Sequence, residues 1–234
     1  MNVPGTEYAW DVLEAAQHLT SFLSREGFHL VATYRYTHLD GSPWWWVLRL
    51  EGSAPDPTTD KMPKRIFPMR RNADGNFELK RPEFGPEGLP LYGLWRLTAY
   101  PHDIYYLAEG EKCADCLSSL GFLGITWHGG AAAVERTNWS PLAGRFVLQW
   151  PDNDQPGFEA MKKAKGILYG QGAHVATVDV AALDLPPKGD VVDWLDRYNR
   201  EHGKEHLHEI RGGFGDAGAI IESLPLIGSG RGDA

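Results

Sequence analysis

The sequence contains only two cysteines among 234 residues, Cys113 and Cys116, which is too few for a framework of disulfides. It also lacks any apolar run long enough to span a membrane. Its first residues have neither the basic nor the apolar region of a signal peptide. These absences lead us to expect a protein of the reducing cytoplasm that makes no contact with membranes.

An excess of positive charge is absent as well, because 23 Lys and Arg stand against 31 Asp and Glu. The net charge of -8 argues against a protein that binds DNA over its whole surface. Residues 1–100 carry 11 basic and 12 acidic side chains, whereas the remainder carries 12 and 19. A solvated acidic surface is the default explanation of that excess, and a carboxylate-rich cation site would also require it.

Carboxylates follow two apolar runs that read as buried strands. Residues 104–108 are followed by Glu109 and a glycine, and residues 145–150 are followed by Asp152 and Asp154. Chemistry in α/β sheets gathers at the carboxyl ends of the strands, so we expect these three side chains at one edge of one sheet. Hard oxygen donors of this kind suit Mg²⁺, which shares its coordination sphere with water and substrate phosphates.

At these residues the sequence resembles the Toprim domain, whose signature is Glu-Gly after one strand and Asp-x-Asp after the next core strand. The residues of its motifs are most similar to those of the Toprim primases of phages and plasmids, which are related to the bacterial-type primases. The resemblance covers roughly residues 104–196 well and the preceding seventy or so more loosely. Four motifs occur in the expected order: Glu109-Gly-Glu-Lys-x-Ala-Asp115, Gly129-Gly-Ala131, Pro151-Asp-Asn-Asp-x-Pro-Gly157 and Pro187-Lys-Gly-Asp-Val-Val-Asp-Trp194.

The resemblance implies roles for individual residues. Asp152 and Asp154 would bind Mg²⁺ or Mn²⁺, and Asp190 is the candidate for a second ion. Glu109 would be a third ligand, or a general base that helps to deprotonate the attacking 3′ hydroxyl. Lys112 is placed to meet a phosphate, although a solvated lysine in the first helical turn is the plain alternative. For Asp154 the alternative is an N-cap.

One position departs from the family pattern. An acidic residue is expected four places after the first glutamate, and Cys113 stands there. If that acid normally helps to hold the second ion, this chain binds metal more weakly or prefers Mn²⁺. Cys113 and Cys116 form a C-x-x-C, but a zinc site needs four ligands and the sequence has no second pair, so we expect both to pack.

The segment from residue 61 to residue 81 is the most basic part of the chain. An Asp-Gly pair at residues 74–75 predicts a hairpin there, and phenylalanines alternate with the basic residues. Such a face suits a groove along a nucleic-acid backbone, and an exposed strand kept soluble by its charges is the alternative. The candidate nucleic-acid or nucleotide contacts are Lys61, Lys64, Arg65, Arg70, Arg71, Lys80 and Arg81.

The predicted fold is α/β: a Toprim domain, Rossmann-like, with a mainly parallel sheet and helices on both faces, after a smaller β-rich α+β region. We expect an N-terminal helix over residues 6–26 and strands over 30–36 and 44–50. In the second strand three successive tryptophans, residues 44–46, could stack on bases, although alternation places at least one in a core. The expected divisions are residues 1–100, a catalytic domain over 101–200, and an extension over 201–234 that frays from Gly212.

The function that this resemblance implies is DNA primase activity, the metal-dependent synthesis of RNA primers on single-stranded DNA for a phage, plasmid or other mobile element. Nucleoside triphosphates and a template would be its substrates, and a replicative helicase, in cis or in trans, its partner. No P-loop motif occurs in the sequence. The alternatives are a Toprim metal-dependent nuclease and a non-catalytic nucleic-acid-binding module of the replication machinery.

Overall fold

The computed structural model describes residues 6–58, 62–202 and 224–227. The chain divides into two compact units, of which the first comprises Met1–His38 and Ser42–Glu83 and the second Leu39–Gly41 and Phe84–Ala234. Apart from the short segment Leu39–Gly41, the boundary between the units lies between Glu83 and Phe84. The short strand β5 (Leu91–Tyr92) pairs with the sheet of the second unit.

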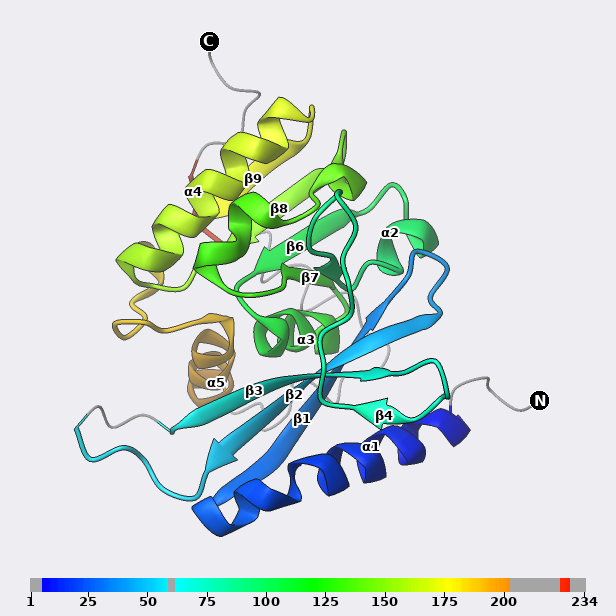
Figure 1. Cartoon of the computed structure of the whole chain (residues 1–234). Helices are drawn as coiled ribbons and strands as arrows, with labels where there is room; N and C mark the ends of the chain where they lie inside the picture. Colours follow the sequence, from blue (N-terminus) through cyan, green and yellow to red (C-terminus); the bar gives the residue numbers. More distant parts are fainter. Residues whose placement is uncertain (1–5, 59–61, 203–223, 228–234) are drawn as a thin grey trace. The chain divides into compact units, whose positions relative to one another are not determined.

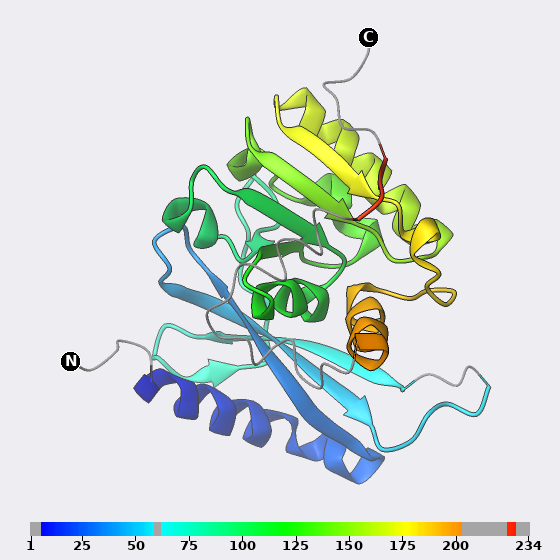
Figure 2. The ribbon, with the colours of Figure 1, turned by 180° about the vertical axis from the view of Figure 1, so that it is seen from behind.

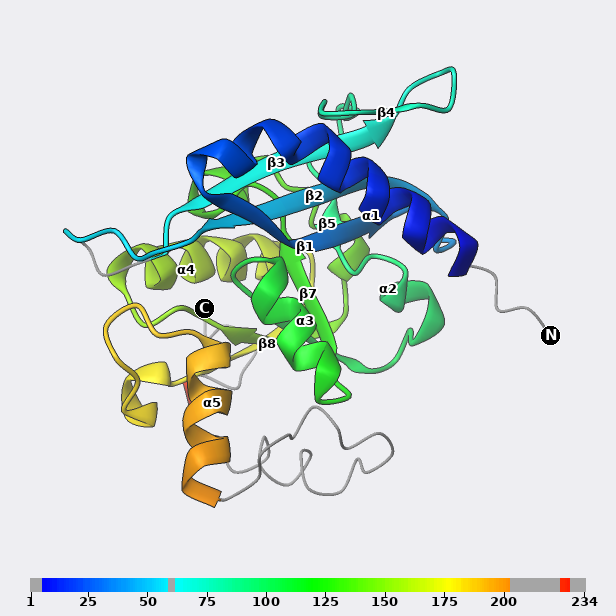
Figure 3. The ribbon, with the colours of Figure 1, turned by 90° about the horizontal axis from the view of Figure 1, so that it is seen from below.

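The first unit is a helix packed on an antiparallel sheet with strand order β1-β2-β3-β4 (Figure 3). Its helix α1 (Thr6–Thr20) tightens into the 3-10 helix η1 (Ser21–Glu26), where the sequence predicted one continuous helix. The hydroxyl of Thr20 donates to the carbonyl of Ala16 at 2.7 Å, a bond that often bends helices. The strands are β1 (Phe28–Thr37), β2 (Pro43–Gly52), β3 (Lys64–Arg71) and β4 (Phe77–Glu78).

The three successive tryptophans of β2 have different surroundings. Trp46 is 5% exposed and belongs to the core beneath α1, whereas Trp45 is 0% exposed and stacks on Tyr36 at a ring distance of 4.5 Å. Trp44 is half-buried and stacks on His38 at 4.9 Å. Trp45 and Trp46 are thus buried on opposite faces of the strand, and Trp44 is the only one of the three that is partly exposed.

The second unit is built on a six-stranded sheet of order β10-β9-β8-β6-β7-β5 (Figures 1 and 2). The four central strands are parallel, and both edge strands are antiparallel to their neighbours. The predicted α/β class with a mainly parallel sheet is confirmed. The further strands are β6 (Ile104–Ala108), β7 (Leu123–Trp127), β8 (Phe146–Trp150), β9 (His174–Val178) and β10 (Leu226–Ile227). The helices are α2 (Arg96–Ala99), α3 (Glu111–Ser119), α4 (Gln155–Gly170) and α5 (Val191–His202), with 3-10 turns η2 (Ala131–Arg136), η3 (Ser140–Leu142) and η4 (Val180–Leu183).

Helices cover both faces of this sheet, α4 on one and α3 and α5 on the other (Figures 1 and 2). Side chains of β6 alternate between the two cores: Tyr105 and Leu107 join the α4 core, and Tyr106 and Ala108 join the core of α3 and α5. Burial on both faces explains why β6 is a continuous apolar run in the sequence.

The C-terminal part of the expected extension is described only at residues 224–227, which include β10. The fraying that we expected from Gly212 concerns residues outside the described ranges. None of the helices in the described ranges combines the length and the apolar character that a membrane span requires.

Candidate active site

The first carboxylate of the candidate site, Glu109, follows β6 directly and is half-buried. Gly110 comes next with φ 82°, a left-handed value that residues with a side chain rarely adopt. This turn carries the chain into α3, and the amide of Gly110 donates to the hydroxyl of Thr126 on β7 at 3.0 Å. The sequence therefore predicted the strand end and the glycine turn as the structure has them.

The second pair of carboxylates lies in the loop between β8 and α4. Asp154 is the N-cap of α4, and its Oδ1 accepts a bond from the amide of Gly157 at 2.8 Å. The amide of Asp152 donates to Oε1 of Glu109 at 3.3 Å. The ends of β6 and β8 are thus joined through the Glu109 side chain. The capping role considered for Asp154 is present, and it uses only one of the two carboxylate oxygens.

A glycine makes room for this contact. A Cβ atom at Gly157 would lie 2.6 Å from Oε1 of Glu109 and 2.8 Å from the carbonyl oxygen of Asp152. Both distances are below any ordinary contact of a methyl group. The Glu109 carboxylate therefore approaches α4 at Gly157, the third residue of the helix. The sequence motif that ends at Gly157 did not indicate this close approach.

The loop before α5 lies against the loop that holds Asp152 and Asp154. The amide of Asn153 donates to the carbonyl of Gly189 at 2.8 Å, and the amide of Lys188 donates to the carbonyl of Asn153 at 2.9 Å. These two backbone bonds bring the loop that carries Asp190 next to the loop after β8.

Asp190 itself caps α5. Its Oδ1 accepts bonds from the amides of Val192 at 2.7 Å and Asp193 at 3.2 Å, and Oδ2 of Asp193 accepts from the amide of Asp190 at 2.9 Å. This reciprocal arrangement resembles a capping box, with aspartate in the place of the usual glutamate. One oxygen of each carboxylate is therefore engaged in holding the helix end.

Cys113, where the Toprim pattern leads one to expect an acid, is close enough to Asp190 and Asp152 to be influenced by both charges. Burial, the negative charges of Asp190 and Asp152, and a hydrogen bond to Asp190 raise the pKa of the Cys113 thiol well above its ordinary value. Burial and the charge of Asp190 also raise the pKa of Cys116 to about 12. Both thiols stay protonated, and Cys113 belongs to the core of α3 and α5, so packing is the role that the structure shows for it.

The described residues contain no group of three or more His, Cys, Asp or Glu side chains arranged to hold a metal ion. The donors still suit a hard cation, because they are carboxylates that repel one another: the charge of Asp154 helps to raise the pKa of Glu109. Asp152, Asp154 and Asp190 supply oxygens from neighbouring loops. The structure thus assembles the donor types at one sheet edge without closing them around a single point.

Burial is the main cause that raises the pKa of Glu109, and the Asp154 charge adds to it, while the Asp152 amide opposes it. A carboxyl group whose pKa is raised by folding lowers the free energy of unfolding as the pH rises from its unfolded pKa, about 4.3, through its folded pKa. In the presence of EDTA, Glu109→Gln should therefore melt at a higher temperature than the wild type at pH 7. Near pH 4 the difference should shrink, because both proteins then carry a neutral side chain there.

Melting curves between pH 4 and pH 8 test this expectation. Glu87→Gln, at an exposed glutamate for comparison, should show no such pH dependence. A gap between Glu109→Gln and the wild type that stays constant over that range would show that the carboxyl is not destabilised by burial.

Two other residues near Glu109 are Lys112, which the sequence analysis named, and His128, which it did not. Lys112 is exposed in the first turn of α3, and its charge lowers the pKa of Cys113 against the other influences. His128, which sequence reasoning missed, follows β7 with Nδ1 4.0 Å from Oε1 of Glu111. A polar residue directly after a buried parallel strand was the signal that could have found it.

The candidate nucleic-acid residues do not form one basic face. In β3, Lys64 and Arg70 lie on the opposite face of the sheet from Arg65 and Arg71, because side chains alternate along a strand. The face of Arg65 is the one that α1 covers, since its partner Leu50 belongs to the core there. The hairpin itself forms as predicted, with β4 pairing antiparallel to β3.

Several of these basic side chains already have partners within the first unit. Arg70 pairs with Glu78, with Nε 2.8 Å from Oε1, and Arg71 lies over the ring of Phe77 at 4.3 Å. Arg65 lies 5.0 Å above the ring of Phe28. Lys64, Arg65, Arg71, Lys80 and Arg81 are exposed, and Lys61 lies outside the described residues.

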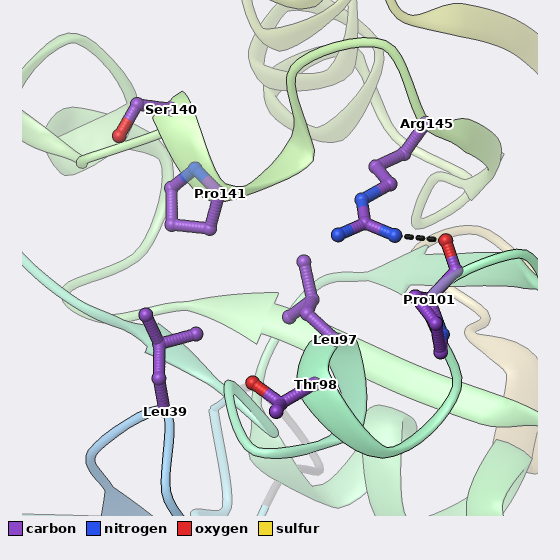
Figure 4. A pocket seen from close by; sticks show the side chains of 7 residues that line it. All are labelled: Leu39, Leu97, Thr98, Pro101, Ser140, Pro141 and Arg145. Atoms are coloured by element: carbon purple, nitrogen blue, oxygen red, sulfur yellow. Dashed lines mark hydrogen bonds between the residues drawn. The ribbon is translucent and has the colours of Figure 1, made fainter.

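A hollow of about 470 Å³ lies at the other end of the sheet, before β6 and β8 begin (Figure 4). The guanidinium of Arg145 donates to the carbonyl of Pro101 across it, and it supplies the one cation among otherwise small or apolar lining groups. The hollow is lined by Leu39, Leu97, Thr98, Pro101, Ser140, Pro141 and Arg145. Because it faces the amino ends of the strands, it is separate from the carboxylates.

Comparison with known proteins finds similarity only at the level of the fold. No model of a known protein family matches the sequence, and no curated protein matches it. The zinc-binding and RNA polymerase domains of the Aquifex aeolicus primase match the structure with a TM-score of 0.51 and 19% sequence identity. The match covers 96% of this chain and 51% of that one, so the chain spans about half of its length.

Two further structures match with lower TM-scores. A primase domain from Pseudomonas aeruginosa matches with a TM-score of 0.38 and 17% identity over 86% of this chain and 71% of that one. The primase fragment of the bacteriophage T7 primase-helicase protein matches with a TM-score of 0.38 and 15% identity, over 79% and 84%. The Aquifex match shows that this chain has a fold of the primase type.

Proposed function

We propose that this chain carries a Toprim-type primase core that joins ribonucleotides on a single-stranded DNA template, in the replication of a phage, plasmid or other mobile element. The observation that carries the proposal is the contact between Glu109 and the amide of Asp152, which unites the ends of β6 and β8 in a primase-type fold. The four ordered motifs support the Toprim assignment and the mobile-element branch.

In this proposal Glu109 accepts the proton of the attacking 3′ hydroxyl. Its raised pKa suits that role, because a base works best when its pKa approaches the working pH. Asp152 and Asp154 would hold Mg²⁺ or Mn²⁺, with Asp190 the candidate for a second ion. When bound, such an ion activates the attacking oxygen and neutralises charge on the phosphoryl group.

The substrates would be nucleoside triphosphates and the template. Lys112, which is exposed in the first turn of α3, would meet a phosphate. The exposed residues Lys64, Arg65, Arg71, Lys80 and Arg81 would contact the nucleic-acid backbone, for which dispersed cations suffice. From the resemblance of the four motifs to the primases of phages and plasmids, we also propose that a replicative helicase acts with this chain, on the same polypeptide or as a separate protein.

A primer-synthesis assay tests the proposal. Mixed single-stranded templates and labelled ribonucleotides would be incubated in Mg²⁺ and, separately, in Mn²⁺, and the products read on a sequencing gel. We expect short oligoribonucleotides from the wild type and a loss of about a hundredfold or more in Asp152→Asn, because an ion contributes several kcal/mol and each 1.4 kcal/mol is about tenfold in rate. Asp103→Asn, an exposed acid before β6, is the matched control and should retain activity.

The other outcomes are equally definite. Shortening of the template without synthesis would replace the primase with a Toprim nuclease. DNA binding without any product in either metal would favour a non-catalytic module. The cysteine in place of an acid at position 113, and the carboxylates that do not close around a single point, would agree with that function. Activity of Asp152→Asn equal to that of the wild type would remove the aspartate from the metal site.

A further inference from the structure

Thr126 is a polar side chain in the interior of β7 with 0% of its surface exposed. Its Oγ1 accepts a hydrogen bond from the amide of Gly110 at 3.0 Å. The same oxygen lies 3.5 Å from the carbonyl of Trp127, toward which its own hydrogen can be directed. Buried hydroxyls are kept when they satisfy a partner, and here that partner is the backbone of the candidate catalytic turn.

The position of this bond relative to the strand pairing is informative. β6 and β7 pair in register from Tyr105 with Leu123 to Leu107 with Ile125, and the ladder then stops. Gly110 turns away at φ 82° to start α3, so its amide has no strand partner and is one of the unpaired donors at the helix start. At the point where the backbone ladder ends, the Thr126 hydroxyl accepts the hydrogen bond of the Gly110 amide.

The neighbour of Thr126 in the sheet acts on the same helix. Tyr92 of β5 pairs with Thr126, and its hydroxyl donates to Oδ1 of Asp115 in α3 at 2.8 Å. Burial raises the pKa of Asp115, and the bond from Tyr92 opposes this. Two adjacent side chains of the sheet therefore hold α3, one at its start and one in its middle.

On its other side, Glu109 is held through its carboxylate by the amide of Asp152 at 3.3 Å. The backbone after it is held by Thr126. The Glu109–Gly110 turn is thus held by two hydrogen bonds, one from the Gly110 amide to β7 and one from the Asp152 amide to the Glu109 carboxylate, and removal of the bond to β7 would free the turn without touching the carboxylates. Loss of a group that orients a ligand or base typically costs about tenfold to a hundredfold in affinity or activity.

We propose that Thr126 is a positioning residue, which fixes the Glu109–Gly110 turn so that the carboxylate is presented correctly for the reaction. The inference rests on the proposed function for its kinetic part. The proposed role does not require Thr126 to touch a substrate, because the side chain is fully buried.

Thr126→Val has nearly the same shape as the wild type and lacks the acceptor, whereas Thr126→Ser retains the acceptor. We expect valine to lower the turnover number for primer synthesis about tenfold to a hundredfold, with little change in the KM for nucleotides, and serine to restore most of it. The exchange of the Gly110 amide, measured by NMR on the metal-free protein, should be about tenfold or more faster in the valine variant. Thr126→Ala is the second variant and should behave like valine.

Thr137→Val is the matched control, because Thr137 is buried too and donates to the carbonyl of Ala133 at 3.0 Å, outside the candidate site. It should lower the melting temperature without changing turnover. Equal turnover in valine and wild type, or an equal loss in serine and valine, would overturn the proposal. If the wild type makes no primers, the proposed function fails, and Gly110 exchange alone decides the positioning role: unchanged exchange in both hydroxyl-free variants refutes it.

Discussion

Gly157→Ala is expected to reduce primer synthesis about a hundredfold, the loss that a misplacement of about 1 Å can cause. The added methyl group would meet the Glu109 carboxylate at 2.6 Å and the Asp152 carbonyl oxygen at 2.8 Å. The carboxylate can rotate away, but the carbonyl belongs to the backbone, so the loop that carries Asp152 must shift. The two strand ends that form the candidate site would be pushed apart, while most of the core remains unaffected.

The measurement combines turnover with Mn²⁺ affinity by electron paramagnetic resonance, and with the melting temperature. Gly166→Ala is the matched control in the same helix, since a Cβ there would meet nothing within 4 Å. It should leave turnover unchanged and stabilise the protein by about 0.5–1 kcal/mol, as alanine generally does in place of glycine inside a helix. Turnover of Gly157→Ala within twofold of wild type would mean that Glu109 does not work from the place where the structure puts it.

The architecture of the second unit was predictable to within a residue or two because its signals are local and strong. β6 coincides with the apolar run of residues 104–108, and β8 begins one residue into the apolar run of residues 145–150. Continuous burial makes a parallel strand apolar at every position, and glycines or prolines mark where such strands end. The first unit was less regular: its helix changes to a 3-10 form after Thr20, where the side chain bonds back to Ala16.

The residues of the candidate site were predictable only in part. Strand ends can be read from the sequence, so Glu109, Asp152 and Asp154 could be named. Contacts across the sheet cannot, because the role of Thr126 depends on the register of β7 with β6, and that of Gly157 on the approach of a distant carboxylate. A threonine in a buried strand and a glycine after a proline carry no distinct signal of their own.

The predicted basic face shows a different limit. Its composition was read correctly, yet a period of two residues separates Lys64 from Arg65 and Arg70 from Arg71 in any strand. A second reason why fewer cations are available than the composition suggests is that some already have partners: Glu78 pairs with Arg70 at 2.8 Å. A count of charges along a strand therefore overestimates what one face can offer to a phosphate backbone, and the proposed contacts reduce to the exposed members of the set.

The largest loss of stability is expected from Gly124→Ala, in β7 beneath α3. An added Cβ would overlap the carbonyl oxygen of Ala114 and lie 2.8 Å from its carbonyl carbon and 2.9 Å from Oγ of Ser118. The first two atoms belong to the helix backbone, so the whole of α3 would have to move away from the sheet. Overpacking of this kind costs about 1–3 kcal/mol. The melting temperature should fall by several degrees, at about 2–4 °C for each kcal/mol in a protein of this size.

The displacement of α3 has a second consequence, because the helix begins directly after the Glu109–Gly110 turn. The hydrogen bond from Gly110 to Thr126 would lengthen, so Gly124→Ala should also speed exchange of the Gly110 amide relative to the amides of β6. Gly166→Ala again gives the reference for a methyl group added to open space. A Gly124→Ala protein that melts within a degree of the wild type, with Gly110 still protected, would mean that α3 does not rest on β7 as closely as the structure shows.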